Sequence, residues 1–425
     1  MSAALAILVG LLSLCPAIVT VDGTITPCLI PLLLAAGLLV VAVKLPPGEA
    51  QHMAAVVSRP IVIAAAFPAV FMIFQLLPLP FLANPVWASL SAGFPHGITG
   101  SVSIDIGATV IALVRYLSAL GAIVLAAAVA INRDRAESVL IGTAAAAALI
   151  SFFALFDELF AFGFLAMRDE ALDCACLGVT LSAACALLVL ERHESRRSKS
   201  GQTQTKFLLA SLASLAAFLI CVGAVAATRS GSLAFAAASG FLTFCAAVAI
   251  RRWNLGRVGA TAIGATAAVI AAALMTAAAS GQDPRFAFAN IDPAGVELTQ
   301  RLLNDAPFFG DGAGNSSALI PIYQPGNSGS STAGIVTAAA KISIEMGKAA
   351  LWLFVAAAAF SVFALLRGAS RRGRDWFYAA AAGACVVTLM NLAFVNTGLS
   401  GVAIASLSSV IFGLGLIQSK GRVAS

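Results

Sequence analysis

The chain has 425 residues, of which 60% are hydrophobic and only 10% are charged. A soluble domain carries about 25% charged residues, and one buried core cannot shelter so much apolar surface. The composition therefore excludes a water-soluble globule and favours a protein whose solvent is the bilayer. The formal net charge of +6 is spread over 25 basic and 19 acidic residues, so it does not indicate nucleic-acid binding.

Apolar runs of about 20 residues, the length that crosses the hydrocarbon layer as a helix, recur along the whole chain. The runs are 3–20, 26–43, 60–80, 106–131, 138–160, 173–190, 207–227, 231–250, 258–280, 349–366, 376–395 and 399–418. They predict an all-α polytopic membrane protein with twelve spans. Nine spans fall within 1–280, a polar outer segment with short helices covers 281–348, and three spans with a cytoplasmic tail cover 349–425.

The distribution of Lys and Arg predicts the orientation. With both termini cytoplasmic, most basic residues flank cytoplasmic helix ends, and the opposite side holds only Arg168, Arg229, Arg285 and Arg301. The positive-inside rule favours this arrangement. We therefore expect a multi-pass protein of a bacterial inner membrane, with 281–348 on the outer side. The first apolar run lacks a basic n-region and is expected to stay as a membrane anchor.

The eight cysteines lie mostly inside apolar runs and form no C-x-x-C pair. No histidine lies within metal-binding spacing of them. We expect them to behave as small apolar residues, and we expect no bound metal or other cofactor.

Arg229 lies in the predicted outer turn Thr228-Arg229-Ser230-Gly231 between two apolar runs. A cation on this side runs against the charge bias and needs a partner. One interpretation is that its planar guanidinium grips an anion such as a lipid-linked phosphate. The alternative is a side chain that reaches the interface or pairs with a nearby carboxylate.

A glycine-rich sequence, PFFGDGAGN, contains Gly310 and Gly312 and lies in the predicted outer segment. Its glycines permit a turn that exposes successive N–H groups, which could bind a ligand. The sequence lacks the Lys-Ser/Thr of a P-loop and the surrounding βαβ unit of a dinucleotide site. The alternative is that it is simply a turn.

Three charged residues, Lys341, Glu345 and Lys348, recur at helical spacing and can share one helix face. They could pair with one another, or they could bind a charged headgroup at the mouth of an outer cavity. Arg115 falls about ten residues into a predicted span, where a charged residue is a functional candidate by default. A buried ion pair with a distant carboxylate is its alternative.

Taken together, the twelve runs, TRSGSLAFAA at the start of one of them, and DAPFFGDGAGN within a long outer segment resemble the O-antigen ligase and O-antigen polymerase superfamily. The following IEMG resembles that family's E-x-G element before its next span. Residues 84–135 also resemble the polysaccharide-synthesis branch, and the resemblance covers nearly the whole chain.

This resemblance implies an inverting glycosyltransferase in surface, exopolysaccharide or O-antigen assembly. A glycan would leave an undecaprenyl diphosphate carrier and join a hydroxyl acceptor at the outer face, without a nucleotide sugar or a metal. The family's helix-opening Arg matches Arg229, which would hold the diphosphate. Expected partners are the lipid-linked glycan, membrane lipids and other proteins of polysaccharide assembly or export.

Two positions depart from the family pattern. The expected second Arg falls at Asp292, although Arg285 and Arg301 flank it, and the expected His falls near Val336-Thr337. His96 and Glu345 are the outer groups that could replace the His as the base. We therefore predict Arg229, Glu345 and His96 as catalytic residues.

The substrate-binding residues that we expect complete the predicted site. They are Arg285, Arg301, Gly310, Gly312 and Lys341. Two other functions stay open: a catalytically degenerate relative that binds lipid-linked glycan or scaffolds export, which the missing His favours, and a twelve-span secondary transporter. Against transport, the sequence shows no paired helices broken by Gly or Pro.

Overall fold

The computed structural model describes residues 1–21, 25–57, 59–91, 99–197, 204–252, 293–323, 334–373 and 375–420, and all regular structure in these ranges is helical. This confirms the predicted all-α class. The helices are α1 (Ser2–Thr20), α2 (Ile25–Lys44), α3 (Pro47–Val56), α4 (Arg59–Leu76), α5 (Pro85–Ser91), α6 (Ile106–Val129), α7 (Arg133–Phe160), α8 (Arg168–Arg197), α9 (Gln204–Ala227), α10 (Gly231–Arg252), α12 (Pro293–Asp305), α13 (Ser316–Tyr323), α14 (Ala338–Met346), α15 (Lys348–Arg371), α16 (Phe377–Leu392), the 3₁₀ turn η1 (Gly398–Ser400) and α17 (Val402–Ser419).

Nine helices of the described ranges are each long and apolar enough to cross a membrane, namely α1, α4, α6, α7, α8, α9, α10, α15 and α17. The pair α2 and α3 adds a tenth if its 119° bend is counted as a broken span. Pro46 and Pro47 lie at that bend, where they cannot continue the helix before them. Helix α16 is apolar but has only 16 residues.

These helices account for part of the predicted twelve spans. The predicted run 258–280 lies outside the described residues. The described chain is therefore a multi-pass membrane protein with nine to ten candidate spans, and the full count of twelve stays a prediction.

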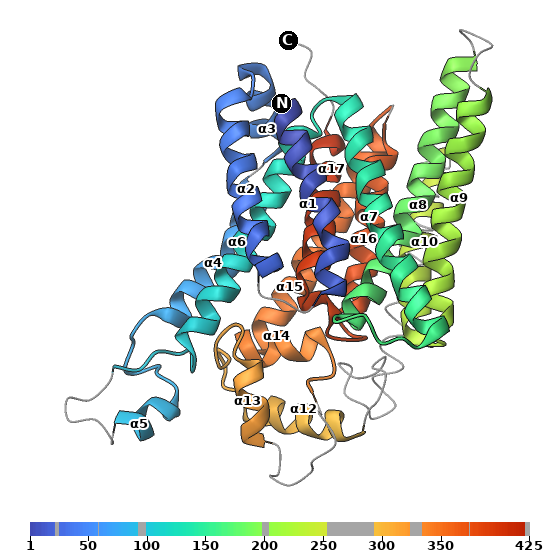
Figure 1. Ribbon diagram of the computed structural model, residues 1–425. Helices are drawn as coiled ribbons and strands as arrows, with labels where there is room; N and C mark the ends of the chain where they lie inside the picture. Colours follow the sequence, from blue (N-terminus) through green and yellow to red (C-terminus); the bar gives the residue numbers. More distant parts are fainter. Residues whose placement is uncertain are drawn as a thin grey trace.

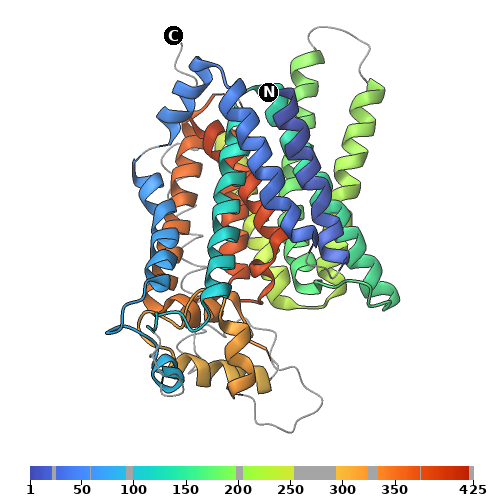
Figure 2. The same ribbon diagram turned by 60° about the vertical axis from the view of Figure 1, so that its left-hand side comes forward.

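The long helices stand side by side, and α1 begins at the same end of the bundle at which α17 finishes (Figures 1 and 2). Helices α5, α12, α13 and α14 lie at the opposite end, which we call the outer end. The two termini thus share one side, as the distribution of basic residues predicts.

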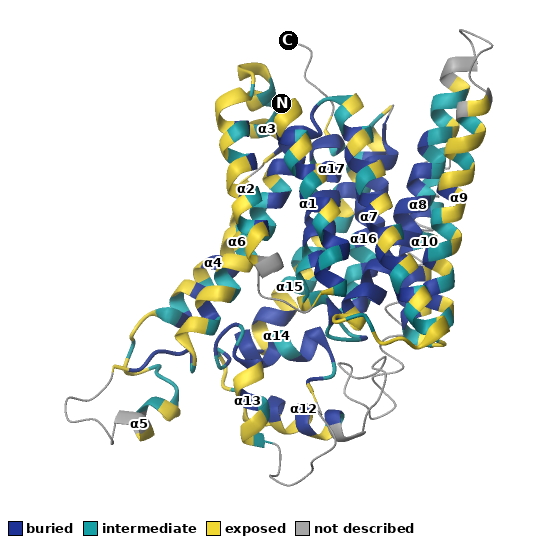
Figure 3. Cartoon of the chain, in the orientation of Figure 1, coloured by how far each residue is buried: buried dark blue, intermediate teal, exposed yellow. Residues whose placement is uncertain are grey.

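The centre of the bundle is made by α8, α16 and α17, whose residues are mostly buried (Figure 3). Small residues let these helices approach closely, as is usual where lipid supplies no hydrophobic drive between helices. For example, a Cβ on Gly240 of α10 would lie 1.9 Å from Thr388 Oγ1 of α16. Large side chains such as Leu209, Leu212 and Leu219 of α9 are exposed and can face lipid.

The outer helices have a small core of their own. Leu298 and Leu302 of α12, Leu319 of α13, and Ala340 and Ile344 of α14 are buried together. The described helices of the polar outer segment, α12, α13 and α14, therefore form an outer layer on the bundle. Helix α14 leads directly into α15.

We expect the outer end to face away from the cytoplasm. In a Cys28→Ser/Cys245→Ser background, which removes the described cysteines that are not buried, Gln300→Cys on α12 should react with a membrane-impermeant maleimide in intact cells. Glu194→Cys near the end of α8 should react only after permeabilisation. Both positions are exposed. The opposite labelling pattern would reverse the orientation and contradict every outer-face assignment.

Candidate functional site

The glycine-rich sequence 307–315 is pressed against the end of α14 and the start of α6. Gly310, Gly312 and Gly314 have φ values of 72°, 107° and 83°, which other residues rarely adopt. A Cβ on Gly310 would lie 2.4 Å from the Glu345 carbonyl, and one on Gly314 would lie 2.8 Å from the carbonyl oxygen of Ala108. The glycines therefore allow a close backbone fit between the outer layer and the bundle.

A buried side chain, Gln75 near the end of α4, adds to this contact. Its Nε2 donates to the backbone oxygens of Phe309, at 3.0 Å, and Glu345, at 2.9 Å. Its Oε1 accepts from the N–H of Ala313 at 3.0 Å. Because buried backbone groups are costly without partners, Gln75 holds α4, the glycine-rich sequence and α14 in one arrangement.

The second fixed point of the outer layer is helix α14 itself. The Ala338 N–H donates to the Asn396 oxygen, and the Ala339 N–H donates to the Ala393 oxygen, each at 2.8 Å. At the other end, Gly347 has a φ of 87°. The two hydrogen bonds hold the start of α14 against the end of α16 and the turn that follows it.

A cavity of about 510 Å³ lies between α14, α6, α2 and the start of α17. One face of α6 forms its longest wall, with Ala108, Ile111, Ala112, Arg115, Ala119 and Ala122. A helix rises about 1.5 Å per residue, so this wall runs for about 21 Å from the outer layer into the bundle. The cavity therefore extends from the outer layer into the part of the bundle that we expect to lie in the membrane.

The charged lining residues of this cavity lie on α14 and halfway along the α6 wall. Lys341 and Glu345 of α14 lie one turn apart on its wall, and Arg115 is exposed to it from α6. The deeper lining, including Leu34, Ala122 and Ala405, is apolar or small. The cavity is therefore amphipathic, with two cations and one carboxylate between its outer end and its middle.

The carboxylate of Glu345 is held in place. Its side chain is 9% exposed, and Oε1 accepts from the Ser316 N–H at 3.4 Å. Within the described residues, neither Lys341 nor Lys348 forms an ion pair with it. The predicted alternative of mutual pairing is therefore wrong for these residues, and Lys341 and Glu345 can both face a ligand in the cavity.

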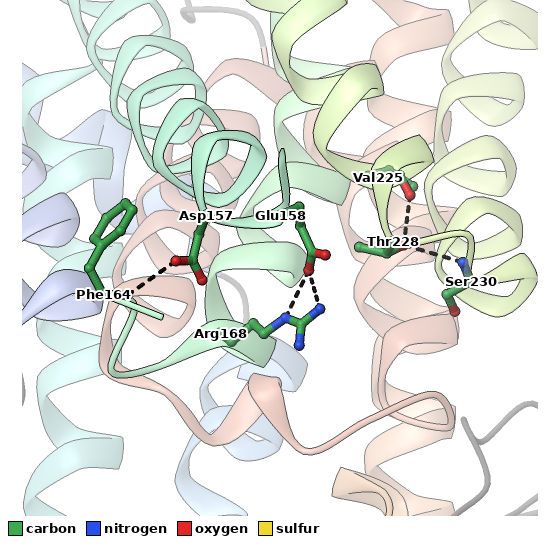
Figure 4. A network of polar contacts seen from close by, with 7 residues as sticks. All are labelled: Asp157, Glu158, Phe164, Arg168, Val225, Thr228 and Ser230. Carbon is green, nitrogen blue, oxygen red and sulfur yellow. Dashed lines mark hydrogen bonds and ion pairs between the residues drawn. The ribbon is translucent and has the colours of Figure 1, made fainter. Parts of the chain in front are cut away.

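Arg229 lies elsewhere on the outer end. It occupies the α9–α10 turn with a φ of 52°, is exposed, and does not line the cavity. In the described ranges no carboxylate pairs with it. The flanking Thr228 donates to Val225 O at 2.7 Å and accepts from the Ser230 N–H at 3.3 Å, beside the Glu158–Arg168 pair that joins α7 and α8 (Figure 4).

None of the other predicted site residues that the structure describes lines the cavity. Arg301 forms an exposed ion pair with Glu297 one turn away on α12. Gly310 and Gly312 contact protein rather than the cavity, and their role in substrate binding stays a prediction. His96 and Arg285 lie outside the described residues.

The position at which the family pattern expects a His is a helix cap. Thr337 is fully buried, and its side chain accepts from the Ala340 N–H at the start of α14. In the described part of the chain, no group of three or more His, Cys, Asp or Glu side chains is arranged to hold a metal ion. Glu345 is the one carboxylate among the lining residues of the cavity.

Two contributors were not foreseen from sequence. Gln75 is a lone polar residue near the end of an apolar run, and its partners are more than 230 residues away. Tyr116 also lines the cavity, and its hydroxyl donates to the Ala65 oxygen of α4 at 2.8 Å. A polar residue inside a predicted span was the only available signal for either.

Titration of the Asp311 carboxyl should make the stability of the fold depend on pH. Burial raises its pKa to about 6, although a hydrogen bond from Asn84 opposes the shift. Because the folded pKa exceeds the unfolded value of about 3.9, folding favours the protonated form. The stabilisation that comes from the protonated Asp311 carboxyl is fully present below about pH 4, and it is lost as the pH rises through 6.

Asp311→Asn should therefore unfold at a higher temperature than the wild type at pH 7, with a smaller difference at pH 4. Thermal unfolding of the detergent-solubilised protein measures this. Asp134→Asn, which alters an exposed carboxylate at the other end of the bundle, should show no such trend. If the unfolding temperatures of Asp311→Asn and the wild type changed in parallel with pH, the raised pKa of Asp311 would be contradicted.

A comparison with models of known protein families found no match, and a comparison with curated protein sequences found none either. The cavity and its side chains therefore carry the functional inference.

Proposed function

We propose that the protein transfers or polymerises glycan carried on undecaprenyl diphosphate, at the outer face of a bacterial inner membrane. The observation that carries this proposal is the cavity along α6. Lys341 and Glu345 line it from α14, Arg115 lies halfway along the α6 wall, and apolar residues lie below. A donor with an anionic head and a long apolar chain has the same distribution of polarity. The resemblance of TRSGSLAFAA and DAPFFGDGAGN to O-antigen ligases and polymerases supports the same class of substrate.

In this proposal the two cations bind the diphosphate. The Arg115 guanidinium can form paired hydrogen bonds with phosphate oxygens, and Lys341 adds a compact charge. The lipid chain lies along the apolar wall below, beside Leu34 and Ala122. The apolar lining disfavours water near the charges, which strengthens each electrostatic contact.

The transfer step forms a bond from the acceptor hydroxyl oxygen to the anomeric carbon. The bond from that carbon to the diphosphate oxygen breaks, and its electron pair leaves with the diphosphate. The hydroxyl proton passes to Glu345, the carboxylate that lines the cavity. Cations beside the leaving diphosphate stabilise the charge that develops on it.

Arg229 enters the proposal through the resemblance. Its exposed guanidinium lies at the outer end and has no carboxylate partner in the described ranges, so it is available to an anion. We assign it a second, separate binding site for lipid-linked diphosphate, outside the cavity.

A binding or scaffold function in polysaccharide export is the second candidate. It is favoured by one observation: a buried Thr337 occupies the position at which the family pattern expects the His base. Under that function the cavity would hold lipid-linked glycan without turnover.

Variants of the cavity separate binding from transfer. Lys341→Met should weaken binding of a lipid-linked glycan donor because it removes a cation from the cavity. Glu345→Gln should leave binding nearly intact and slow transfer by about 10² to 10⁴, the usual contribution of a positioned acid–base group. Binding and product formation by purified protein measure the two effects.

The matched control is Lys348→Met, which removes an exposed cation that does not line the cavity. It should behave as the wild type. Wild-type protein that binds donor but forms no product with any acceptor would exclude the enzyme and leave the binding function.

Arg229→Lys tests the second binding site. It should abolish transfer while expression is retained, because an ammonium cannot reproduce the paired hydrogen bonds of a guanidinium. Polymer formation in a cellular complementation assay measures this. Unchanged polymer would reduce Arg229 to a topology or packing residue and leave the cavity as the whole site.

A further inference from the structure

A buried carboxylate, Glu170 in the first turn of α8, lies directly behind one wall of the cavity. That wall is the turn between η1 and α17, where Leu399, Ser400, Gly401 and Val402 line the cavity. A Cβ on Gly401 would lie within 2.4 Å of the Glu170 carboxylate. Only a glycine therefore separates this charge from the ligand space at that point.

Glu170 is fixed by backbone hydrogen bonds. It is 4% exposed, and its Oε1 accepts from the N–H groups of Ala403 and Ile404 at the start of α17. Asp173, one turn further along α8, holds the same turn by accepting from Asn396 Nδ2 at 2.9 Å. These hydrogen bonds tie the cavity wall to the first turns of α8.

The charge of Glu170 acts on the same space as the cations. Arg115 lines the same cavity from α6, and its charge interacts with that of Glu170. The two cations of the cavity, Arg115 and Lys341, are therefore offset by two carboxylates, Glu345 on the wall and Glu170 behind it. An anion that enters is attracted by the first pair and repelled by the second.

We propose that Glu170 sets the charge selectivity of this cavity, by lowering its affinity for the most highly charged anions. The inference rests on the proposed function, because it takes a lipid phosphate as the ligand. Repulsion between charges grows in proportion to the ligand charge. A free lipid diphosphate carries more charge than the same diphosphate esterified to a glycan, so Glu170 disfavours the product relative to the donor and promotes its release.

Two substitutions of Glu170 separate the effect of its charge from the effect of its hydrogen bonds to α17. Glu170→Gln keeps an oxygen at the position that accepts both N–H groups of α17 and loses the charge. Glu170→Ala loses both. A purely structural role predicts that both variants weaken binding or leave it unchanged, whereas the charge role predicts tighter binding of anions by Glu170→Gln.

The experiment compares three probes, farnesyl diphosphate, farnesyl monophosphate and uncharged farnesol, by titration of the purified full chain in nanodiscs. Glu170→Gln should bind the diphosphate at least about fivefold more tightly than the wild type, which is the change expected for one unit of ligand charge about 4 Å from a carboxylate in bulk water. The monophosphate should gain less, and farnesol should be unaffected. Glu158→Gln, which removes a carboxylate at the same end of the bundle but away from the cavity, should leave all three affinities unchanged.

Unchanged or weaker diphosphate binding by a Glu170→Gln protein with normal thermal unfolding would overturn the inference while the proposed function stands. Should that variant fail to fold, the wild type decides: the inference expects diphosphate to bind no more than a few-fold better than monophosphate, and a much larger preference overturns it. A wild type that binds neither phosphate better than farnesol overturns both the proposed function and this inference.

Discussion

The outer layer of the protein depends on buried polar contacts centred on Gln75. In the interior of a bundle, a backbone group without a partner is costly, and Gln75 satisfies three such groups on two separate outer segments. The glycine-rich sequence is folded so that its backbone reaches this side chain. As a result α14 lies across the outer end of α6, and Lys341 and Glu345 face the same cavity as Arg115.

The balance of charge in the cavity follows from the same constraint. Helix α14 brings one cation and one carboxylate, α6 brings Arg115, and α8 places Glu170 behind the glycine wall. Ionised groups in so apolar an environment are retained only where they find partners or serve a ligand. Glu170 finds its partners in the first N–H groups of α17, where the helix dipole also favours a negative charge. Within the described residues Arg115 and Lys341 form no ion pair with a carboxylate, and in the proposed function they bind an anionic ligand.

Much of this architecture could be predicted from sequence, because apolar runs and basic flanks report on each segment alone. The shared side of the termini and the helical spacing of Lys341 and Glu345 were of this kind. The assembly of the cavity could not be predicted, since Gln75 and Glu170 act on partners more than 230 residues away. The close packing of the glycines of 307–315 against α14 and α6 could not be predicted for a related reason, because the segments that they contact are distant in the sequence.

The central claim is that the cavity along α6 holds the anionic head of a lipid. A structure of the protein in nanodiscs with bound undecaprenyl diphosphate tests it most directly. We expect diphosphate density within hydrogen-bonding distance of Arg115 and Lys341, with the lipid chain continuing along the α6 wall towards Ala122. Diphosphate density at the α9–α10 turn beside Arg229, with the cavity empty of lipid, would contradict the claim.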